Sequence, residues 1–539
     1  MTADKSGLPD WLESQMQVTR MDVVSYRGPG AAGGVSSGLE TAWRNQQAAD
    51  VSWWFLGENA LKFLTPAKEI AEFVTQLTDT VVTGHYAYCN ELIWPLMHDL
   101  PQFASYNAEN RAHYRRFNTT FAEHISFERT SKKRYFIQDY QLALLPRLLG
   151  AQGGRSNIFW HIPWPKNVKE EYVEAIAEIA RGMLSAESIG FHTVEYAQNF
   201  MTFVRRHLNE FRINSKDQTV YRAQARLAPR ELDLAAGSEL TPYVMRPLMH
   251  SVSSASPSTK LVVQPLGIDN ERWKKLAREG KAPLDKVGVI PGERFVLSID
   301  RADYTKAVLD RLRIIDLLME QNETLRGTVA FVQICGRSRA GVEVFDSYWN
   351  ECRALADAIN ARWEQNGWTP IRWVDQGLSA AELAPLYAIA DAMLVNPVRD
   401  GLNLTAKEFI ACRVHHPGVL LLSPGAGAWY EIGQHALAAD PNKHQETADA
   451  IVRALNMPQA EKFERTTMMR HKIERNPVSM WWKQFVHASQ HHNRLAQATE
   501  TSVQPTGKVA QTSGKVATGK VAQTTVGAAA DAQKKAKTA

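Results

Sequence analysis

The residues best placed for chemistry lie in the stretch Val398–Glu408. It follows an apolar run, Ala392–Pro397, that predicts a strand, and a helical pattern comes after it. In such a strand–loop–helix unit, the backbone N–H groups of Gly401, Leu402 and Asn403 would be free at the start of the helix. Free N–H groups and the helix dipole together favour a bound anion. The stretch therefore predicts a phosphate site.

Two carboxylates accompany this loop. Asp400 lies within it and would face the same cleft as the phosphate. Leu404 and Glu408 are four residues apart, so they share one face of the predicted helix. Glu408 could then accept hydrogen bonds from hydroxyl groups near the phosphate, such as those of a ribose. A structural alternative stays open, in which Asp400 caps the helix and Glu408 is solvated.

Two cations follow the first predicted strand of the second half of the chain. The strand is Phe295–Asp300, and Arg301 and Lys306 come after it. A guanidinium and an ammonium group at the carboxyl end of a parallel strand can stabilise negative charge on a departing phosphate. The alternative is a surface pair beside the strand end.

Three polar residues stand at or just beyond the ends of predicted strands in the first half: Asp139, His161 and His192. Ligands of open parallel sheets bind at the carboxyl ends of the strands, which puts these residues in one candidate cleft. For His161 the alternative is a satisfied core histidine. Pro163 and Pro165 impose a fixed turn after it, which favours the ligand role.

The scaffold that must position these residues alternates strands with helices in both halves of the chain. This alternation predicts an α/β fold with open parallel sheets. In the first half we expect a glycine-rich loop at 27–35, a helix at 38–46 and an amphipathic helix at 66–81. In the second half we expect strands at Phe295–Asp300, Thr328–Ile334, Ile371–Val374, Ala392–Val398 and Val419–Ser423.

The length of 539 residues exceeds one ordinary domain and predicts two. We expect a flexible leader (1–20), an N-terminal domain (21–285), a C-terminal domain (286–476), a helix packing between the domains (477–496) and a disordered tail rich in Lys, Ala and Thr (497–539). From Thr501 onward, six lysines and one aspartate account for the net charge of +5. The folded part is therefore neutral overall, and nucleic acid is not an expected partner.

Composition narrows the class of protein further. The sequence is 44% hydrophobic and 22% charged, as in ordinary globular proteins. No apolar run reaches the length of a membrane span, and the polar start, Met1–Lys5, lacks the apolar core of a signal peptide. We therefore expect a cytoplasmic protein. The 4 cysteines have no CxxC spacing, which argues against a disulfide framework and a zinc site.

Taken together, the motifs resemble those of the trehalose-6-phosphate synthases, the retaining glycosyltransferases of family 20, with their glucosylglycerol-phosphate synthase relatives. The resemblance runs roughly from Val23 to Leu495, with its pieces in the family's order. They are Phe159–Pro165 (F-x-H-I-P-F-P in the family), Ile189–Thr193 (GF-[HQ]-T), Arg301–Lys306 (R-x-D-Y-x-K-G), Val332–Arg339 (V-Q-I…S-R) and Asp400–Glu408 (D-G-[ML]-N-L-x-A-K-E). The last piece is the most specific.

This resemblance implies a GT-B architecture, in which two Rossmann-like domains face each other across a cleft. It implies donor contacts from Gly34, Arg301, Lys306, Asp400, Gly401, Leu402, Asn403, Leu404 and Glu408, with Arg301 and Lys306 on the diphosphate and Glu408 on the ribose. It implies a catalytic set of Arg301, Lys306, Asp400 and His161, the last two touching the transferred glucose. It implies an acceptor pocket of Arg27, Trp94, Asp139 and Arg339, whose arginines take the acceptor's phosphate.

The chemistry that the resemblance implies is a front-face transfer, in which the departing phosphate oxygen takes the acceptor's proton. No metal and no other cofactor is expected, and UDP-, ADP- or GDP-glucose would be a co-substrate. The expected partners are therefore small molecules: the nucleotide-glucose and a sugar phosphate or glycerol phosphate. The oligomeric state stays open, and a homo-oligomer is compatible with the sequence.

Departures from the family's pattern gather on the acceptor side. Gln138 and Gln141 replace the two histidines of V-H-D-Y-H-L, and Tyr26 replaces the asparagine of V-S-N-R. Elsewhere, Ala307 replaces the glycine that follows D-Y-x-K. The family's tyrosine near the sugar phosphate has three candidate equivalents here: His85, Tyr86 and Tyr88.

The expected activity is synthesis of trehalose 6-phosphate from nucleotide-glucose and glucose 6-phosphate. One alternative is a glucosylglycerol-phosphate synthase, which would use ADP-glucose and glycerol 3-phosphate in osmolyte synthesis. A second alternative is a non-catalytic regulator that binds sugar phosphates. Retention of Arg301, Lys306, Asp400 and Glu408 speaks against the regulator.

Overall fold

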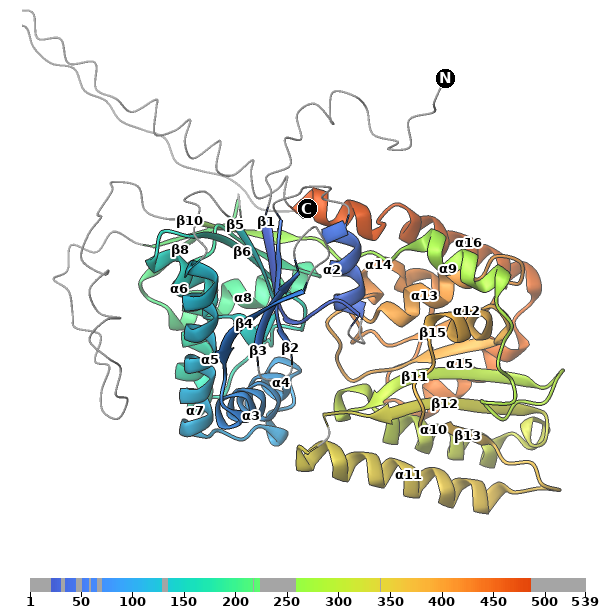
Figure 1. Cartoon of the computed structure of the whole chain (residues 1–539). Helices are drawn as coiled ribbons and strands as arrows, with labels where there is room; N and C mark the ends of the chain where they lie inside the picture. Colours follow the sequence, from blue (N-terminus) through green and yellow to red (C-terminus); the bar gives the residue numbers. More distant parts are fainter. Residues whose placement is uncertain are drawn as a thin grey trace, which may run out of the picture. The chain divides into compact units, whose positions relative to one another are not determined.

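The computed structural model describes residues 21–30, 34–44, 51–57, 60–64, 70–127, 134–216, 218–222, 258–339 and 341–485 (Figure 1). The predicted leader (1–20) and tail (497–539) lie outside these ranges, as do residues 31–33 of the glycine-rich loop. The described residues form two sheets flanked by helices, which confirms the predicted α/β class. None of their helices combines the length and apolar character that crossing a bilayer requires.

The first sheet has ten strands in the order β4-β3-β2-β1-β5-β6-β7-β10-β9-β8. The strands from β2 to β10 in this order are parallel, and antiparallel pairs extend the sheet at both edges. The strands are β1 (Met21–Arg27), β2 (Trp53–Gly57), β3 (Ala60–Leu64), β4 (Ile70–Gln76), β5 (Arg134–Gln138), β6 (Arg155–Trp160), β7 (Ser188–Phe191), β8 (Phe211–Asn214), β9 (Thr219–Arg222) and β10 (Ser258–Val263). The helices of this half are α2 (Gly34–Arg44), α3 (Asp79–Ala87), α4 (Trp94–Met97), α5 (Ala108–Phe127), α6 (Leu145–Ala151), α7 (Glu170–Met183) and α8 (Val194–His207).

The second sheet has six parallel strands in the order β13-β12-β11-β14-β15-β16. Counted within this half, the order is that of the Rossmann fold, with a reversal between β11 and β14. The strands are β11 (Arg294–Ala302), β12 (Val329–Arg337), β13 (Ile371–Val374), β14 (Ala392–Val395), β15 (Val419–Leu422) and β16 (Leu437–Ala438). The helices are α9 (Asn270–Glu279), α10 (Val308–Gln321), α11 (Glu343–Trp363), α12 (Ala380–Ile389), α13 (Leu404–Cys412), α14 (Trp429–Ile432), α15 (His444–Asn456) and α16 (Gln459–Glu474).

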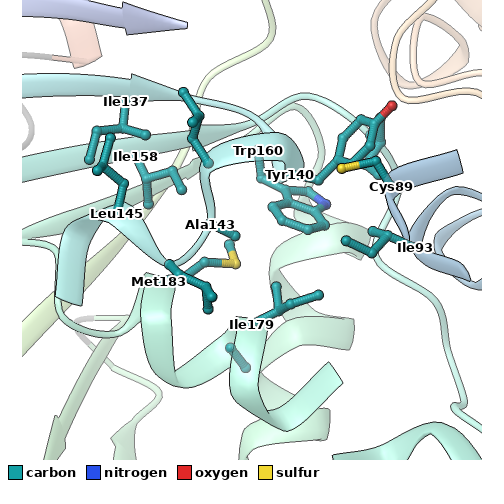
Figure 2. Packing of buried hydrophobic residues seen from close by; sticks show 14 of the residues in the cluster. Cys89, Ile93, Ile137, Tyr140, Ala143, Leu145, Ile158, Trp160, Ile179 and Met183 are labelled. Atoms are coloured by element: carbon teal, nitrogen blue, oxygen red, sulfur yellow. The ribbon is translucent and has the colours of Figure 1, made fainter. Parts of the chain in front are cut away.

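Successive residues of a strand point to opposite sides of its sheet. In each of these sheets, the side chains on both sides are buried. In β11, Phe295 and Leu297 join a cluster with α12 and α13, whereas Val296 joins one with α10 and α15. The first sheet has a large cluster on one face, part of which Figure 2 shows around Trp160 and Tyr140. Burial on both faces explains the near-continuous apolar runs that marked these strands in the sequence.

The predicted helix at 66–81 is wrong. Residues 70–76 form strand β4, which pairs with β3 in an antiparallel hairpin, and α3 starts only at Asp79. The apolar spacing fitted a helix, but the β-branched and aromatic residues of this stretch suit a strand, and the neighbouring β3 offers a pairing edge. The helix predicted at 38–46 corresponds to α2, whose described residues are Gly34–Arg44; residues 45–46 lie outside the described ranges.

The last described segment, 478–485, is helical and packs on the first sheet. Trp481 is fully buried against Phe136 and Phe159, and its indole N–H donates to the carbonyl of Gln264 at 3.2 Å. The same cluster includes Leu402 from the predicted phosphate loop. The remainder of the predicted helix at 477–496 lies beyond the described residues.

Candidate active site

The predicted chemistry residues of the second half meet where the strand order reverses. Strands β11 and β14 are neighbours, and the loops that follow them carry Lys306 and Asp400. The backbone N–H of Val398 donates to the carbonyl of Thr305 at 2.9 Å, which joins the two loops directly. A reversal of strand order opens a crevice at the carboxyl ends, where open α/β sheets bind ligands.

Lys306 and Asp400 form an ion pair across this crevice, and both side chains are 13% exposed. The Asn403 amide also donates to Asp400 at 3.1 Å. Burial would raise the pKa of Asp400, but the Lys306 charge and these hydrogen bonds outweigh it and lower that pKa. Asp400 is therefore a carboxylate next to an ammonium group, rather than the helix cap of the alternative interpretation.

Asn403 is the residue that caps α13. Its backbone is left-handed, with φ of 69°, and its side-chain oxygen accepts from the N–H of Ala406 at 3.3 Å. The Leu402 N–H is not free as predicted, because it donates to Asp400 Oδ1 at 3.4 Å. Within the described ranges, the N–H groups of Gly401 and Asn403 have no hydrogen-bond acceptor. Two of the three predicted donors thus remain open to an anion.

The loop at Gly401 lies directly against the first half of the chain. A Cβ at Gly401 would approach the backbone oxygen of His161 to 2.0 Å, so only glycine fits. The Tyr196 hydroxyl donates to the carbonyl of Asp400 at 2.8 Å. Arg399, next in the loop, pairs with Asp99 at 3.1 Å and with Glu195 at 2.9 Å. Predicted residues from both halves therefore come together here.

Arg301 and Arg27 are exposed, and neither guanidinium has an ion-pair or hydrogen-bond partner among the described residues. Arg301 is nevertheless surrounded by other groups of the site. This partial desolvation, followed by repulsion from Arg339, lowers its pKa. Uncompensated guanidinium groups at a crevice are suited to a phosphate, to which they bind in a bidentate manner.

Arg339 is buried and already paired. It forms an ion pair with Asp303, donates to Asn90, and lies 3.9 Å above the ring of Trp94. The Trp94 indole N–H also points to Asp303, at 3.4 Å. Burial would raise the pKa of Asp303, but Arg339, Arg301 and Lys306 hold it well below its usual value. Arg339 and Trp94 lie together as the acceptor prediction requires, with Asp303 as a partner that sequence reasoning missed.

The histidines and Asp139 form a separate, largely buried group. Asp139 has a left-handed backbone, with φ of 68°, and accepts from the His161 N–H at 3.0 Å. Burial raises its pKa to about 7. His161 is 5% exposed, and both its ring nitrogens have protein partners, His192 at 3.2 Å and Gln138 at 2.9 Å. Burial lowers the pKa of His161 to about 3, so the ring is neutral.

The remaining predicted donor residues, Glu408, Leu404 and Gly34, lie on helices α13 and α2. Glu408 is half-buried on α13, and the Tyr387 hydroxyl donates to it at 3.4 Å. Burial raises the pKa of Glu408 to about 7, as suits a carboxyl group in a dry site. Leu404 begins α13, and Gly34 begins α2.

Arg311, which the sequence analysis did not predict as a site residue, holds together the segments that form the crevice. It is fully buried on α10, and its guanidinium donates to Asn396, Gln333 and Asp300 at 2.7, 3.0 and 2.8 Å. These three partners come from the loop after β14, from β12 and from β11. A fourth contact reaches the carbonyl of Lys306 at 3.3 Å. Arg311 therefore fixes the strand ends that carry the site.

Comparison with known proteins agrees with this geometry. The profile described as Glycosyltransferase family 20 matches residues 60–491. The chain belongs to glycosyltransferase family 20. It is therefore a glycosyltransferase enzyme, and its architecture is GT-B, as predicted.

Three individual proteins illustrate the similarity of this family 20 chain. It is 28% identical over 473 residues to the "Trehalose-6-phosphate synthase" of Mycobacterium leprae, covering 85% of this chain and 89% of that protein. It is 29% identical over 420 residues to the "Bifunctional trehalose-6-phosphate synthase/phosphatase" of Thermoproteus tenax, covering 76% of this chain and 52% of that protein, so it spans about half of that relative. A UDP-forming synthase structure from Burkholderia xenovorans matches with a TM-score of 0.74 and 26% identity, covering 88% of this chain and 99% of that one.

Ala307, where the family has glycine, carries backbone strain in this family 20 enzyme. Its φ is 52° and its ψ 40°, a left-handed conformation that costs an L-residue about 1–2 kcal/mol. We expect Ala307→Gly to keep turnover and raise stability by up to about 1 kcal/mol, since glycine relieves this strain. Ala307→Val should lose at least about 2 kcal/mol, because a β-branched residue tolerates positive φ poorly. Thermal melts of the three proteins, with parallel rates, check this order; a more stable valine variant would contradict it.

Proposed function

We propose that the chain transfers glucose, with retention of configuration, from a nucleotide-glucose to glucose 6-phosphate and so forms trehalose 6-phosphate. The observation that carries the proposal is the crevice where Lys306 and Asp400 pair beside the open guanidinium of Arg301. The names of the family 20 relatives support the acceptor. Because the Burkholderia xenovorans protein is described as UDP-forming, UDP-glucose is the first donor to test.

In this mechanism, cations stabilise the departing diphosphate. Arg301 and Lys306 hold the phosphate oxygens, on which negative charge grows as the glycosidic bond breaks. The open N–H groups of Gly401 and Asn403 add donors near the start of α13. Asp400 releases Lys306 to the phosphate and accepts hydrogen bonds from the glucose hydroxyls. The departing phosphate oxygen takes the proton of the attacking hydroxyl on the same face of the sugar.

The acceptor binds at the other end of the crevice. Arg27 is exposed there and takes the acceptor's phosphate, while Arg339 and Trp94 form the wall. Asp139, with its raised pKa, accepts or donates a hydrogen bond to an acceptor hydroxyl. The chemistry needs no metal ion, since the fixed cations provide the charge stabilisation.

One observation favours a smaller acceptor as the second candidate. Tyr26, where the family has asparagine, stacks on His85 with ring centroids 5.5 Å apart. This aromatic pair lies beside Arg27 and takes up space that an asparagine would leave. Glycerol 3-phosphate, with ADP-glucose as donor, is the corresponding alternative.

An acceptor scan tests the proposal. Purified full-length chain is given UDP-, ADP- or GDP-glucose with glucose 6-phosphate or glycerol 3-phosphate, each with and without EDTA, and nucleoside diphosphate release is measured. We expect release with UDP-glucose and glucose 6-phosphate, with rates that EDTA changes by less than about 2-fold. If nucleoside diphosphate is released only with glycerol 3-phosphate, that molecule and not glucose 6-phosphate is the acceptor. If the protein binds nucleotide-glucose but releases no nucleoside diphosphate with any pair, the regulator would be favoured. Loss of activity in EDTA would show that a metal is needed.

A further inference from the structure

A chain of buried hydrogen bonds passes behind the candidate active site. The Leu266 N–H donates to His192 Nδ1 at 3.3 Å, and His192 Nε2 lies 3.2 Å from His161 Nδ1. His161 Nε2 lies 2.9 Å from Gln138 Oε1, and the Gln138 amide nitrogen donates to the carbonyl of Phe136 at 3.3 Å. All five residues are at most 5% exposed, so water does not compete for these bonds.

The two ends of this chain fix the position of every proton in it. Leu266 contributes a backbone N–H, which can only donate, so His192 Nδ1 must accept and its Nε2 must carry the hydrogen. That hydrogen is donated to His161 Nδ1, which leaves the hydrogen of His161 on Nε2. Phe136 contributes a carbonyl, which can only accept, so the amide nitrogen of Gln138 faces it and the amide oxygen faces His161. Each ring therefore has one possible neutral tautomer.

A second proton on either ring would create a donor–donor contact. Burial lowers the pKa of both histidines, and for His192 the neighbouring His161 and Lys407 lower it further; a hydrogen bond with the backbone of Gln264 raises the pKa of His192 without offsetting these effects. The charged groups nearest the chain are fixed as well. Lys407 donates to the carbonyl of Leu266 at 2.9 Å and pairs with Glu431, and Asp139 accepts the His161 N–H. Neither Lys407 nor Asp139 therefore offers His161 or His192 a partner for an added proton.

The chain also connects the two parts of the site. Lys407 lies on α13, whose N-terminal end is the Asp400–Asn403 loop, and Gln138 ends β5 of the first sheet. Between them, the backbone oxygen of His161 is packed so closely on Gly401 that no Cβ would fit. The loop that carries Asp400 is therefore packed on the backbone of the residue whose ring these hydrogen bonds hold.

We propose that His161 and His192 are neutral positioning residues of fixed tautomer, and that Gln138 sets the tautomer from one end of this hydrogen-bond chain. Their task is to hold the Asp400–Asn403 loop in register with the first half of the chain. Proton transfer is not part of that task, because no ring nitrogen is free to exchange a proton. The catalytic consequence rests on the proposed transfer reaction, whereas the proton positions do not.

The first test is a direct observation of the tautomers. The full-length chain is labelled with ¹⁵N-histidine, and long-range ¹H–¹⁵N spectra are recorded between about pH 5 and 8.5, with His161→Gln and His192→Gln used to assign the signals. We expect both rings to be neutral, with hydrogen on Nε2, at every pH. A ring that titrates in this range, or one with hydrogen on Nδ1, overturns the proposal. This readout decides the matter even if the enzyme proves inactive with all donor–acceptor pairs.

Matched variants of His192 test the positioning role. In His192→Gln, the side-chain amide can accept from the Leu266 N–H and donate to His161, so the direction of the chain is kept; His192→Leu can do neither. We expect the glutamine variant to keep kcat/KM within about 3-fold of wild type and the leucine variant to lose about 10-fold or more, with KM for the donor rising, because a buried group is left unpaired.

Gln138→Met tests the positioning role from the other end of the hydrogen-bond chain. It replaces His192→Leu as the test variant if that protein does not fold. It keeps the side-chain size but leaves the Nε2–H of His161 without an acceptor. We expect the Nε2–H signal of His161 to shift and the donor KM to rise by about 10-fold. Variants that match wild type in both spectra and kinetics would show that the hydrogen-bond chain does not position the Asp400–Asn403 loop.

Discussion

Arg301→Ala and Lys306→Ala are each expected to lower turnover by about 10²-fold or more, the usual scale for removing one preorganised group that stabilises charge in a transition state. Both side chains lie at the reversal of strand order between β11 and β14, where the departing diphosphate would sit. Initial rates with the substrate pair that the acceptor scan identifies measure the effect. Lys443→Ala provides the control, because Lys443 forms an exposed ion pair with Glu446 and belongs to neither of the two loops that carry Lys306 and Asp400.

The two substitutions should differ in stability. Arg301 forms no ion pair within the described residues, and Asp303, whose carboxylate it helps to stabilise, keeps its ion pair with Arg339, so removal of Arg301 leaves no charge unpaired. Lys306 is paired with the largely buried Asp400, so Lys306→Ala leaves a carboxylate without its cation and should also lower the melting temperature. A rate near that of wild type in either variant would contradict the diphosphate role. If both variants lost stability equally, their low rates would reflect unfolding of the protein and not the loss of a catalytic group.

Sequence reasoning could propose the candidate donor residues because their signals in the sequence are local. The strand, glycine loop and helix around Asp400–Glu408 are contiguous, and Arg301, at the end of β11, is close in sequence to Lys306, which follows that strand. Such segments carry their own geometry, and the Rossmann strand order then brings the two loops together. The ion pair between Lys306 and Asp400 shows that the two loops meet, whereas the donor role of their residues stays a prediction.

Partners that are far apart in the sequence could not be predicted in this way. The contact between His161 and Gln138 depends on the pairing of β5 with β6, and that between Arg339 and Asp303 on the pairing of β11 with β12. Strand β4 was mistaken for a helix for the same reason, since its partner β3 decides its conformation. Periodicity alone does not state which segments become neighbours.

Arg311 was not predicted, although it left a signal in the sequence. Along α10, the buried positions include Val308, Leu312 and Ile315, and the helical period places position 311 on the same face. A charged residue at a core position is rare unless it is paired. The pattern therefore indicates a buried ion pair, although it does not name Asp300 as the partner.

Arg311→Met is accordingly expected to cost about 3–5 kcal/mol, because it leaves the buried carboxylate of Asp300 without its cation and Asn396 and Gln333 without a donor. Thermal and denaturant unfolding measure the loss. Arg313→Met is the matched control on the same helix, since Arg313 is half exposed and its pair with Asp310 is worth about 0–1 kcal/mol.

The double variant Arg311→Met with Asp300→Asn separates the two origins of this loss. If the unpaired charge dominates, neutralising Asp300 should recover most of the stability, because a buried pair replaced on both sides is often close to neutral. Turnover should remain low, since the carbonyl of Lys306 and the end of β14 would still lack the contacts with which Arg311 holds them. If stability and turnover recovered together, Arg311 would serve only to neutralise Asp300, and the strand ends would keep their positions without it.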